Sequence, residues 1–157
     1  MPKAAAIINP TAANGKASKV WQQYNASLKT QGILCSEFIT EAPGHGISFS
    51  KQALMQGCEL ILAVGGDGTL NEVANGFFDN GKLINPDATL GIVPKGTGTD
   101  FVRTLNVPKT SDALAKCILK NQTRKIDVGR LACHSFDGQP ITRYFINVAD
   151  VGYGGAL

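Results

Sequence analysis

The strongest constraint in this 157-residue chain is the regular spacing of short apolar runs, each followed by a helical pattern. Runs typical of strands begin near residues 4, 33, 59 and 88, with amphipathic repeats between them. An interval of about thirty residues is the length of a β-α-β unit, which pairs its two strands in parallel. The runs at residues 4–8 and 60–64 are apolar throughout, as expected for strands covered on both faces. The sequence therefore predicts a three-layer α/β/α domain around a parallel sheet.

Glycine, proline and capping residues predict where these elements end. We expect strands over residues 4–9, 33–40, 59–64 and 88–93, and a polar connection over residues 79–87. The expected helices carry Ala17 to Leu28, Ile47 to Leu54, a stretch from Thr69, a short stretch from Thr99 or Asp100, and a segment capped by Ser111 and Asp112.

The last part of the chain changes character. Residues 126–133 and 141–149 are β-like and are joined by a turn around Asp137-Gly138, with no helical pattern between them. This order favours a hairpin over another β-α-β unit. We expect residues 1–122 to form the α/β domain and residues 123–157 to begin a second, β-rich domain, so that the sequence is a fragment.

Composition excludes several classes of protein. Hydrophobic residues make up 43% of the chain, charged residues 17%, and no apolar run approaches the ~20 residues of a transmembrane helix. The net charge of +3 comes from scattered cations rather than a basic stripe, so a nucleic-acid partner is not expected. This charge could assist a peripheral membrane encounter without anchoring the protein. The four cysteines form no C-x-x-C pair, which favours reduced thiols in a cytoplasmic protein over a zinc site.

Candidate chemistry gathers in the loops that follow the four strands, because ligands of such sheets bind beyond the carboxyl ends of the strands. The loops at residues 9–16, 40–46, 65–72 and 94–101 each place glycine or small hydroxyl residues before a helix, where unpaired amides favour phosphate. Three glycines in the four positions from Gly65 to Gly68 make the third loop the strongest candidate. His45 is interpreted as a solvated helix-start residue rather than a base.

The standard phosphate signatures are missing from these loops. The chain has no G-x-x-x-x-G-K-[ST], and its first strand ends in Asn9-Pro10 instead of the dinucleotide-binding G-x-G-x-x-G. A P-loop NTPase and a dehydrogenase therefore fit poorly. Asp67 places a carboxylate in the phosphate loop, where it would act through Mg²⁺ or hold a hydroxyl. This pattern points to metal-dependent phosphoryl transfer.

The sequence GGDGTLNEV at residues 65–73, followed by Asn75-Gly76, resembles the signature of the diacylglycerol kinase catalytic domain. This family includes bacterial lipid kinases, sphingosine kinases and ceramide kinases, and G-G-D-G-T alone is shared with NAD kinases. Asn9-Pro10, Thr40-Glu41 with Gly44-His45, and the loop from Gly96 to Phe101 resemble further motifs of the family. The resemblance covers nearly the whole chain. It departs at Thr99, where the family usually has Asn, and in an apparently longer loop after Asn9-Pro10.

The resemblance implies an ATP site in which Asp67 is needed for catalysis. It places at the nucleotide Asn9, Pro10, Thr11, Thr40, Gly65, Gly66, Asp67, Gly68, Thr69, Leu70, Asn71, Gly96 and Thr97. We expect ATP as co-substrate, Mg²⁺ as cofactor with no metal site complete within these residues, and a lipid acceptor presented at a membrane surface. The general base and the structural Mg²⁺ site are expected in the second domain, so residues 1–157 alone should be inactive.

The resemblance implies a lipid kinase that transfers the γ-phosphoryl group of ATP to the hydroxyl of diacylglycerol or a related lipid. Two alternatives stay open at this point. One is an NAD kinase-like enzyme, and the other is a nucleotide-binding module without catalysis. A homodimer also stays open, and the location is expected to be cytoplasmic with peripheral contact to the membrane.

Overall fold

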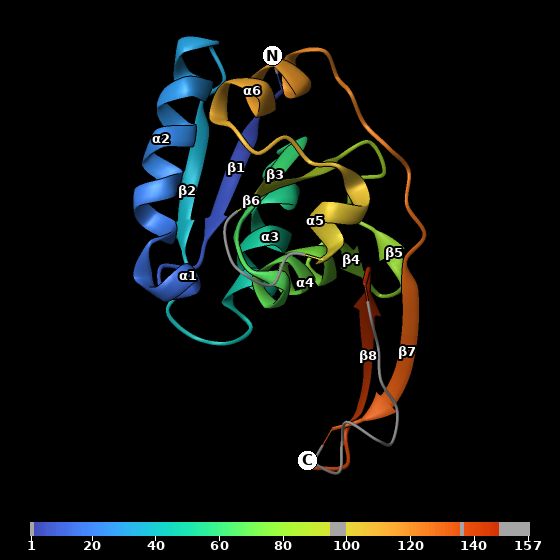
Figure 1. Ribbon diagram of the computed structural model, residues 1–157. Helices are drawn as coiled ribbons and strands as arrows, with labels where there is room; N and C mark the ends of the chain where they lie inside the picture. The colour runs from blue at the N-terminus through green and yellow to red at the C-terminus, as the bar shows by residue number, and fades with distance from the viewer. Residues whose placement is uncertain (1, 95–99, 136, 148–157) are drawn as a thin grey trace. The chain divides into compact units, whose positions relative to one another are not determined.

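The computed structural model describes residues 2–94, 100–135 and 137–147 (Figure 1). The chain divides into two compact units, Met1–Arg124 and Lys125–Leu157. The first unit contains β1 (Ala4–Ile8), α1 (Ala12–Gly15), α2 (Ala17–Thr30), β2 (Cys35–Ile39), α3 (His45–Met55), β3 (Leu60–Gly65), α4 (Asp67–Asn75), β4 (Phe78–Asp79), β5 (Lys82–Leu83), β6 (Thr89–Pro94), α5 (Asp100–Leu105) and α6 (Ser111–Leu119).

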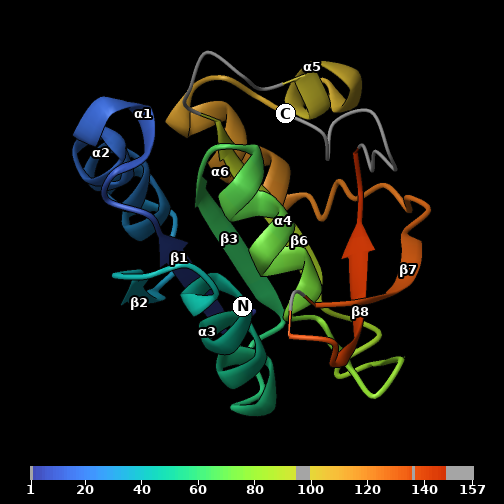
Figure 2. The same cartoon turned by 90° about the horizontal axis from the view of Figure 1, so that it is seen from below.

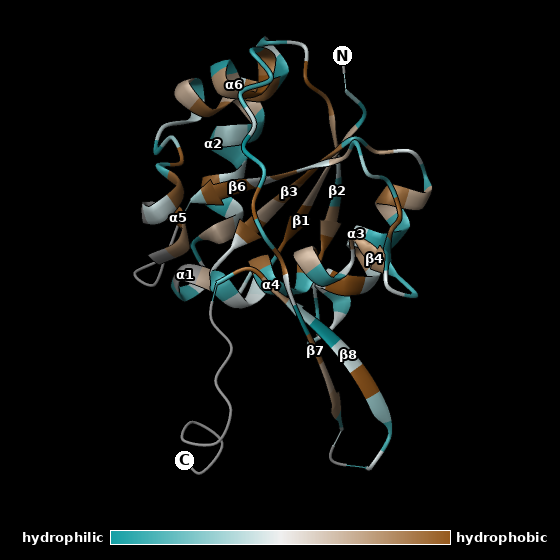
Figure 3. Cartoon of the chain, turned by 90° about the vertical axis from the view of Figure 1, so that its right-hand side faces the viewer, coloured by the Kyte–Doolittle hydropathy of each residue, from teal (hydrophilic) through white to brown (hydrophobic). Residues whose placement is uncertain are grey.

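Four strands of this unit form one parallel sheet in the order β2-β1-β3-β6. Helices α2 and α6 cover one face of this sheet, and α3 and α4 cover the other (Figures 1 and 3). The predicted three-layer α/β/α domain is thus confirmed. The register aligns Ile8 of β1 with Ile39 of β2 and Val64 of β3, so these strands end together at one edge.

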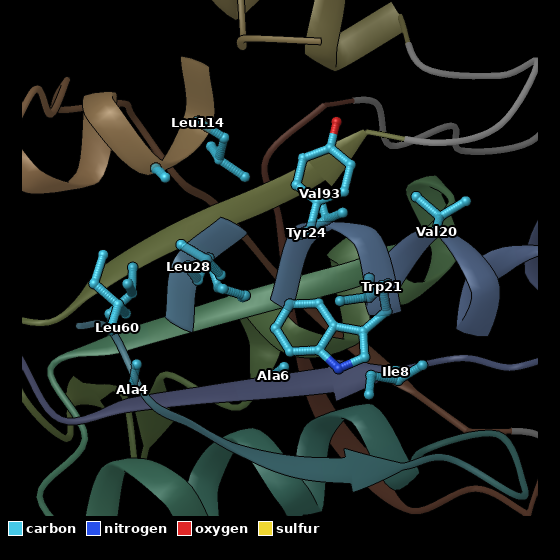
Figure 4. Close-up of a cluster of buried hydrophobic side chains, with 14 residues drawn as sticks. Ala4, Ala6, Ile8, Val20, Trp21, Tyr24, Leu28, Leu60, Val93 and Leu114 are labelled. Carbon is cyan, nitrogen blue, oxygen red and sulfur yellow. The ribbon is translucent and has the colours of Figure 1, made fainter. Parts of the chain in front are cut away.

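The core beneath α2 explains why the sequences of strands β1 and β3 are continuously apolar. Alternate residues of β1 and β3 point toward α2, and every residue of β1 is buried. Figure 4 shows Val20, Trp21, Tyr24 and Leu28 of α2 packed over the strands, together with Leu114 of α6. Burying each large side chain of this kind is worth about 1.5–3 kcal/mol. The apolar residues of α2 therefore recur every three or four positions because they form the face of the helix that packs on the sheet.

Two local predictions need correction. The connection over residues 79–87 contains a short antiparallel hairpin, β4 with β5, whose strands are too short to leave an alternating pattern. The loop after Pro10 contains one turn of helix, α1, and its greater length relative to the family stays a prediction. Helix α6 is capped by Thr110, whose Oγ1 accepts a hydrogen bond from the N–H of Ala113, rather than by Ser111 and Asp112.

The second unit contains an antiparallel hairpin of β7 (Gly129–His134) and β8 (Pro140–Phe145). Gly138 in the connecting turn has φ +80°, a left-handed conformation that glycine adopts without cost. Gly129 pairs with Phe145, and a methyl group at Gly129 would overlap the phenyl ring. The predicted hairpin is confirmed. The boundary predicted at residues 122/123 stays a prediction about the domains of the whole protein.

Candidate phosphate-binding site

The carboxyl ends of β1, β2 and β3 bring three of the predicted loops to one edge of the sheet (Figure 2). The N–H of Asn9 donates to the carbonyl of Val64 at 3.0 Å, and the N–H of Thr40 donates to the carbonyl of Ile8 at 2.8 Å. These bonds continue the parallel pairing by one residue past the strands. Asn9, Thr40 and Gly65 therefore begin their loops side by side, although they are far apart in the sequence.

Helix α4 begins at this edge with three amide groups that have no hydrogen-bond partner among the described residues. Gly66 is the residue before the helix, and its carbonyl accepts the first helical hydrogen bond from the N–H of Leu70 at 3.0 Å. The amides of Asp67, Gly68 and Thr69 precede that bond and have no partner within the helix. They lie at the positive end of the helix dipole, which favours an anion such as phosphate. The helix begins two residues before the predicted start at Thr69.

The glycines of this loop play two different roles. A methyl group at Gly65 would lie 2.6 Å from Cβ of Thr69, so this glycine lets strand β3 turn tightly into α4. At Gly66 and Gly68 no atom of the described residues lies within 4 Å of the place where a side chain would begin, so the space at these two positions is open. This open space fits a phosphate group that approaches the backbone closely.

The backbone conformations of the glycines correct one expectation. The sequence alone predicts that Gly66 and Gly68 tolerate no side chain, because a Cβ would take space that phosphates need or forbid a positive φ, and that Gly44 is more forgiving. Gly66 is extended, with φ −91° and ψ −170°, and Gly68 is not among the residues with positive φ. Gly44, which was expected to tolerate substitution better, is the glycine with a left-handed conformation, φ +87°. The left-handed backbone conformation that favours glycine therefore occurs at Gly44 in the second loop and not at Gly66 or Gly68 in the third.

Asn9 joins the first loop to the start of α4. Its Nδ2 donates a hydrogen bond to Oγ1 of Thr69 at 3.1 Å. Its Oδ1 accepts hydrogen bonds from the N–H of Thr11 at 3.1 Å and from the hydroxyl of Thr11 at 2.8 Å. One side chain thus holds the turn after β1 and the first turn of α4 together. This arrangement gives the Asn9-Pro10 motif a structural role at the site edge.

Asp67 is the first residue of α4, and its side chain is half-buried. No described residue donates a hydrogen bond to its carboxylate. A carboxylate in this place stabilises the helix through the dipole and keeps its oxygens available for a cation. No cluster of three metal-ligating side chains occurs among the described residues. Mg²⁺ usually takes one or two carboxylates and completes its octahedron with waters and substrate phosphates.

The second loop is tied to α4 by Glu72, a residue that the sequence analysis did not assign to the site. Its carboxylate accepts hydrogen bonds from the N–H groups of Gly44 and Gly46, both at 2.9 Å. His45 lies between them, accepts a hydrogen bond from the N–H of Glu41 through Nδ1 at 3.3 Å, and packs edge-on against Phe49. No local sequence pattern signals this role, because the contact joins two elements that are far apart in the chain.

The remaining residues that the sequence places at the nucleotide differ in their burial and in their position at this edge. The side chain of Leu70 is 4% exposed and belongs to the core, so a contribution to a ligand could come only from its backbone. Asn71 is exposed, and its carbonyl accepts a hydrogen bond from Nδ2 of Asn75 at 2.8 Å. Pro10 is half-buried in the turn after β1. Gly96, Thr97 and Thr99 lie outside the described residues.

A parallel sheet covered on both faces, with a glycine-rich turn into a helix at its carboxyl edge, defines an α/β domain of the kind that binds ligands at that edge. A family model, the diacylglycerol kinase catalytic domain, matches residues 3–131. The chain therefore belongs to the diacylglycerol kinase catalytic domain family.

Individual relatives agree with this family. The chain is 31% identical over 150 residues to a diacylglycerol kinase of Staphylococcus carnosus, covering 96% of this chain and 45% of that protein. It is 34% identical over 154 residues to a diacylglycerol kinase of Bacillus subtilis, covering 97% and 46%. The crystal structure of a diacylglycerol kinase from Bacillus anthracis superposes with a TM-score of 0.66 at 29% identity, covering 88% of this chain and 47% of that one.

The chain thus spans a little under half the length of these relatives. In the part of the chain that the structure describes, no helix is both long and apolar enough to cross a bilayer.

Proposed function

We propose that the whole protein is an ATP- and Mg²⁺-dependent lipid kinase, which transfers the γ-phosphoryl group of ATP to the hydroxyl of diacylglycerol or a related lipid. The observation that carries the proposal is the group of unpaired amides at the start of α4, beside the open space at Gly66 and Gly68. Membership of the diacylglycerol kinase catalytic domain family supports the choice of reaction. The names of the relatives support the choice of acceptor.

In this proposal the phosphates of ATP bind where α4 begins. The amides of Asp67, Gly68 and Thr69 donate hydrogen bonds to phosphate oxygens, and the helix dipole adds to the attraction. Asn9 keeps the β1 loop and α4 at a fixed separation through its bond to Thr69. Phosphoryl transfer depends mainly on positioning and on charge stabilisation, so a rigid set of donors is what this chain needs to supply.

Asp67 is the residue that would hold Mg²⁺, directly or through a bound water. A magnesium ion there would neutralise part of the negative charge on the phosphates. The part-exposed carboxylate, with no donor among the described residues, remains available for this role. Because diacylglycerol resides in a bilayer, we place the reaction at a membrane surface, with the protein cytoplasmic and peripherally bound.

A single assay separates this function from its competitors. The full-length protein would be incubated with γ-labelled ATP and Mg²⁺ in the presence of diacylglycerol in mixed micelles, a sphingoid base, or NAD. We expect label in phosphatidic acid, and loss of that label when EDTA removes the metal. Label only in the sphingoid base would make another lipid the acceptor. Label only in NADP would identify an NAD kinase-like enzyme, and binding of ATP without any transfer would identify a non-catalytic module.

A further inference from the structure

The carboxylate of Glu72 occupies the N-terminal end of a neighbouring helix. Glu72 lies in α4, and its two oxygens accept the hydrogen bonds from Gly44 and Gly46 at the start of α3. Free amides at such a helix end attract an anion. In this protein the anion is a side chain of the chain itself, and both oxygens of the carboxylate are used.

The start of α3 is shaped around this carboxylate. A methyl group at Gly46 would lie 2.7 Å from both Cβ and Oε2 of Glu72, so any larger residue would push the carboxylate away. Gly44 has φ +87°, which an L-residue rarely adopts. Gly46 therefore makes room for Glu72, and both glycines that flank His45 donate their amides to it.

The contact also fixes the loop between β2 and α3. At one end of this loop the N–H of Thr40 is bonded to the carbonyl of Ile8 in β1. At the other end Glu72 holds Gly44 and Gly46 against α4. The loop is thus attached both to the sheet and to the helix whose first amides face the open space. Glu72 lies five residues after Asp67, about 7.5 Å along the helix axis.

We propose that Glu72 is a positioning residue of the nucleotide site, which fixes the loop 40–46 against α4 and fills the end of α3 so that phosphates bind at α4. This inference rests on the proposed function, since it assigns the role of a contact around the same site. A packing role alone would be redundant, because the hydroxyl of Ser50 already donates a hydrogen bond from α3 to the carbonyl of Val73 in α4 at 2.9 Å.

The test compares both sides of the contact with a matched control in the full-length protein. Glu72→Ala removes the carboxylate, Glu72→Gln keeps the volume and one acceptor oxygen, and Gly46→Ala displaces the carboxylate without changing its charge. Ser50→Ala removes a different hydrogen bond between the same two helices. The dissociation constant of ATP is measured by calorimetry, KM and kcat by phosphoryl transfer, and the amides of Gly44 and Gly46 by hydrogen exchange.

We expect Glu72→Ala and Gly46→Ala to weaken ATP binding and to raise KM for ATP by about tenfold or more, with kcat within about threefold, because ground-state and transition-state binding are lost together. Glu72→Gln should have a smaller effect in the same direction. The amides of Gly44 and Gly46 should exchange at least about tenfold faster in Glu72→Ala. Ser50→Ala should lower the melting temperature and leave ATP affinity unchanged.

ATP affinity equal to wild type in Gly46→Ala and in both Glu72 variants, while exchange at Gly44 and Gly46 accelerates, would overturn the proposal. If Glu72→Ala does not fold, Glu72→Gln and Gly46→Ala decide between the same two results. A wild-type protein that binds ATP but phosphorylates no lipid would contradict the proposed function alone. The comparison of ATP affinities would still decide the role of Glu72.

Discussion

The side-chain amide of Asn9 donates a hydrogen bond of 3.1 Å to the hydroxyl of Thr69, sixty residues further along the chain. This bond connects the end of the central strand β1 to the first turn of α4. Thr69 is 6% exposed, so its hydroxyl has little access to water and depends on partners within the protein. Two motifs that are separate in the sequence therefore form one structural unit at the edge of the sheet.

We expect Asn9→Ala and Thr69→Val each to destabilise the protein by about 1–2 kcal/mol, since each leaves a buried or half-buried polar partner without its bond. The double variant should cost less than the sum, with a coupling energy of about 0.5 kcal/mol or more between the two residues. Urea unfolding of the four proteins measures this cycle. Strictly additive losses would show that the bond contributes nothing to the stability of the site edge.

The glycines of the third loop should separate stability from binding. Gly65→Ala forces a methyl group against Thr69 and should lower the free energy of unfolding by about 1–3 kcal/mol. Gly66→Ala and Gly68→Ala meet open space in an ordinary conformation, so their folding stability should stay within about 0.5 kcal/mol. Their ATP affinity should fall sharply, because the methyl group takes space that the phosphates need.

Thermal unfolding and nucleotide titration of the three glycine variants check this division. Gly44→Ala serves as a contrast, since its φ of +87° should cost roughly 1–2 kcal/mol through the backbone. Unchanged ATP affinity in both Gly66→Ala and Gly68→Ala would mean that the phosphates bind elsewhere.

Asp67→Asn and Asp67→Ala should leave the fold intact and abolish most of the activity. The half-buried carboxylate receives no hydrogen bond from a described residue, and a favourable charge at a helix start is worth about 0.3–2 kcal/mol, which the fold can lose. Turnover of the full-length protein should fall by at least ~10²-fold, the scale of other charge-stabilising contacts in transition states. Circular dichroism provides the folding control. Turnover near that of wild type would reduce Asp67 to a helix-start residue.

The fold was predictable from the sequence because its main determinants are periodic. The runs at residues 4–8 and 60–64 are apolar at every position and lie between two layers of helices. The face of α2 with Val20, Trp21, Tyr24 and Leu28 repeats at helical spacing because it packs on the sheet. The hairpin of β4 and β5 was not predictable in this way, since strands of two residues carry no period.

The candidate site was only partly accessible from the sequence. Strand ends and glycine clusters indicated the edge and the third loop, because parallel strands bring their carboxyl ends together. The bonds from Glu72 to the start of α3 and from Asn9 to Thr69 are contacts between separate elements, which no local pattern encodes. The roles of Gly65, Gly66 and Gly44 also differ, and they could not be predicted because they depend on tertiary neighbours and on backbone angles.

Cys35 should be a poorly reactive thiol. Burial, with smaller contributions from the charges of Glu37 and Cys58, raises its pKa from 9.0 to about 11. Between about pH 9 and pH 11, the Cys35 thiol is therefore protonated in the native protein and ionised in the unfolded chain. The stability that follows from this shift is fully present below about pH 9 and is lost as the pH rises through about 11. Alkylation of Cys35 by iodoacetamide, followed by peptide mass spectrometry, measures the thiolate directly.

In native protein we expect the alkylation rate of Cys35 to keep rising up to about pH 11, whereas in denatured protein it should level off above about pH 9. Equal pH profiles in the two states would contradict the effect of burial on this thiol.

The most direct test of the account is the crystal structure of the full-length protein with a non-hydrolysable ATP analogue and Mg²⁺. The account predicts phosphate oxygens at about 3 Å from the amides of Asp67, Gly68 and Thr69, with the metal ion on the side of the Asp67 carboxylate. Phosphates bound at the start of α3, or away from this edge of the sheet, would contradict it.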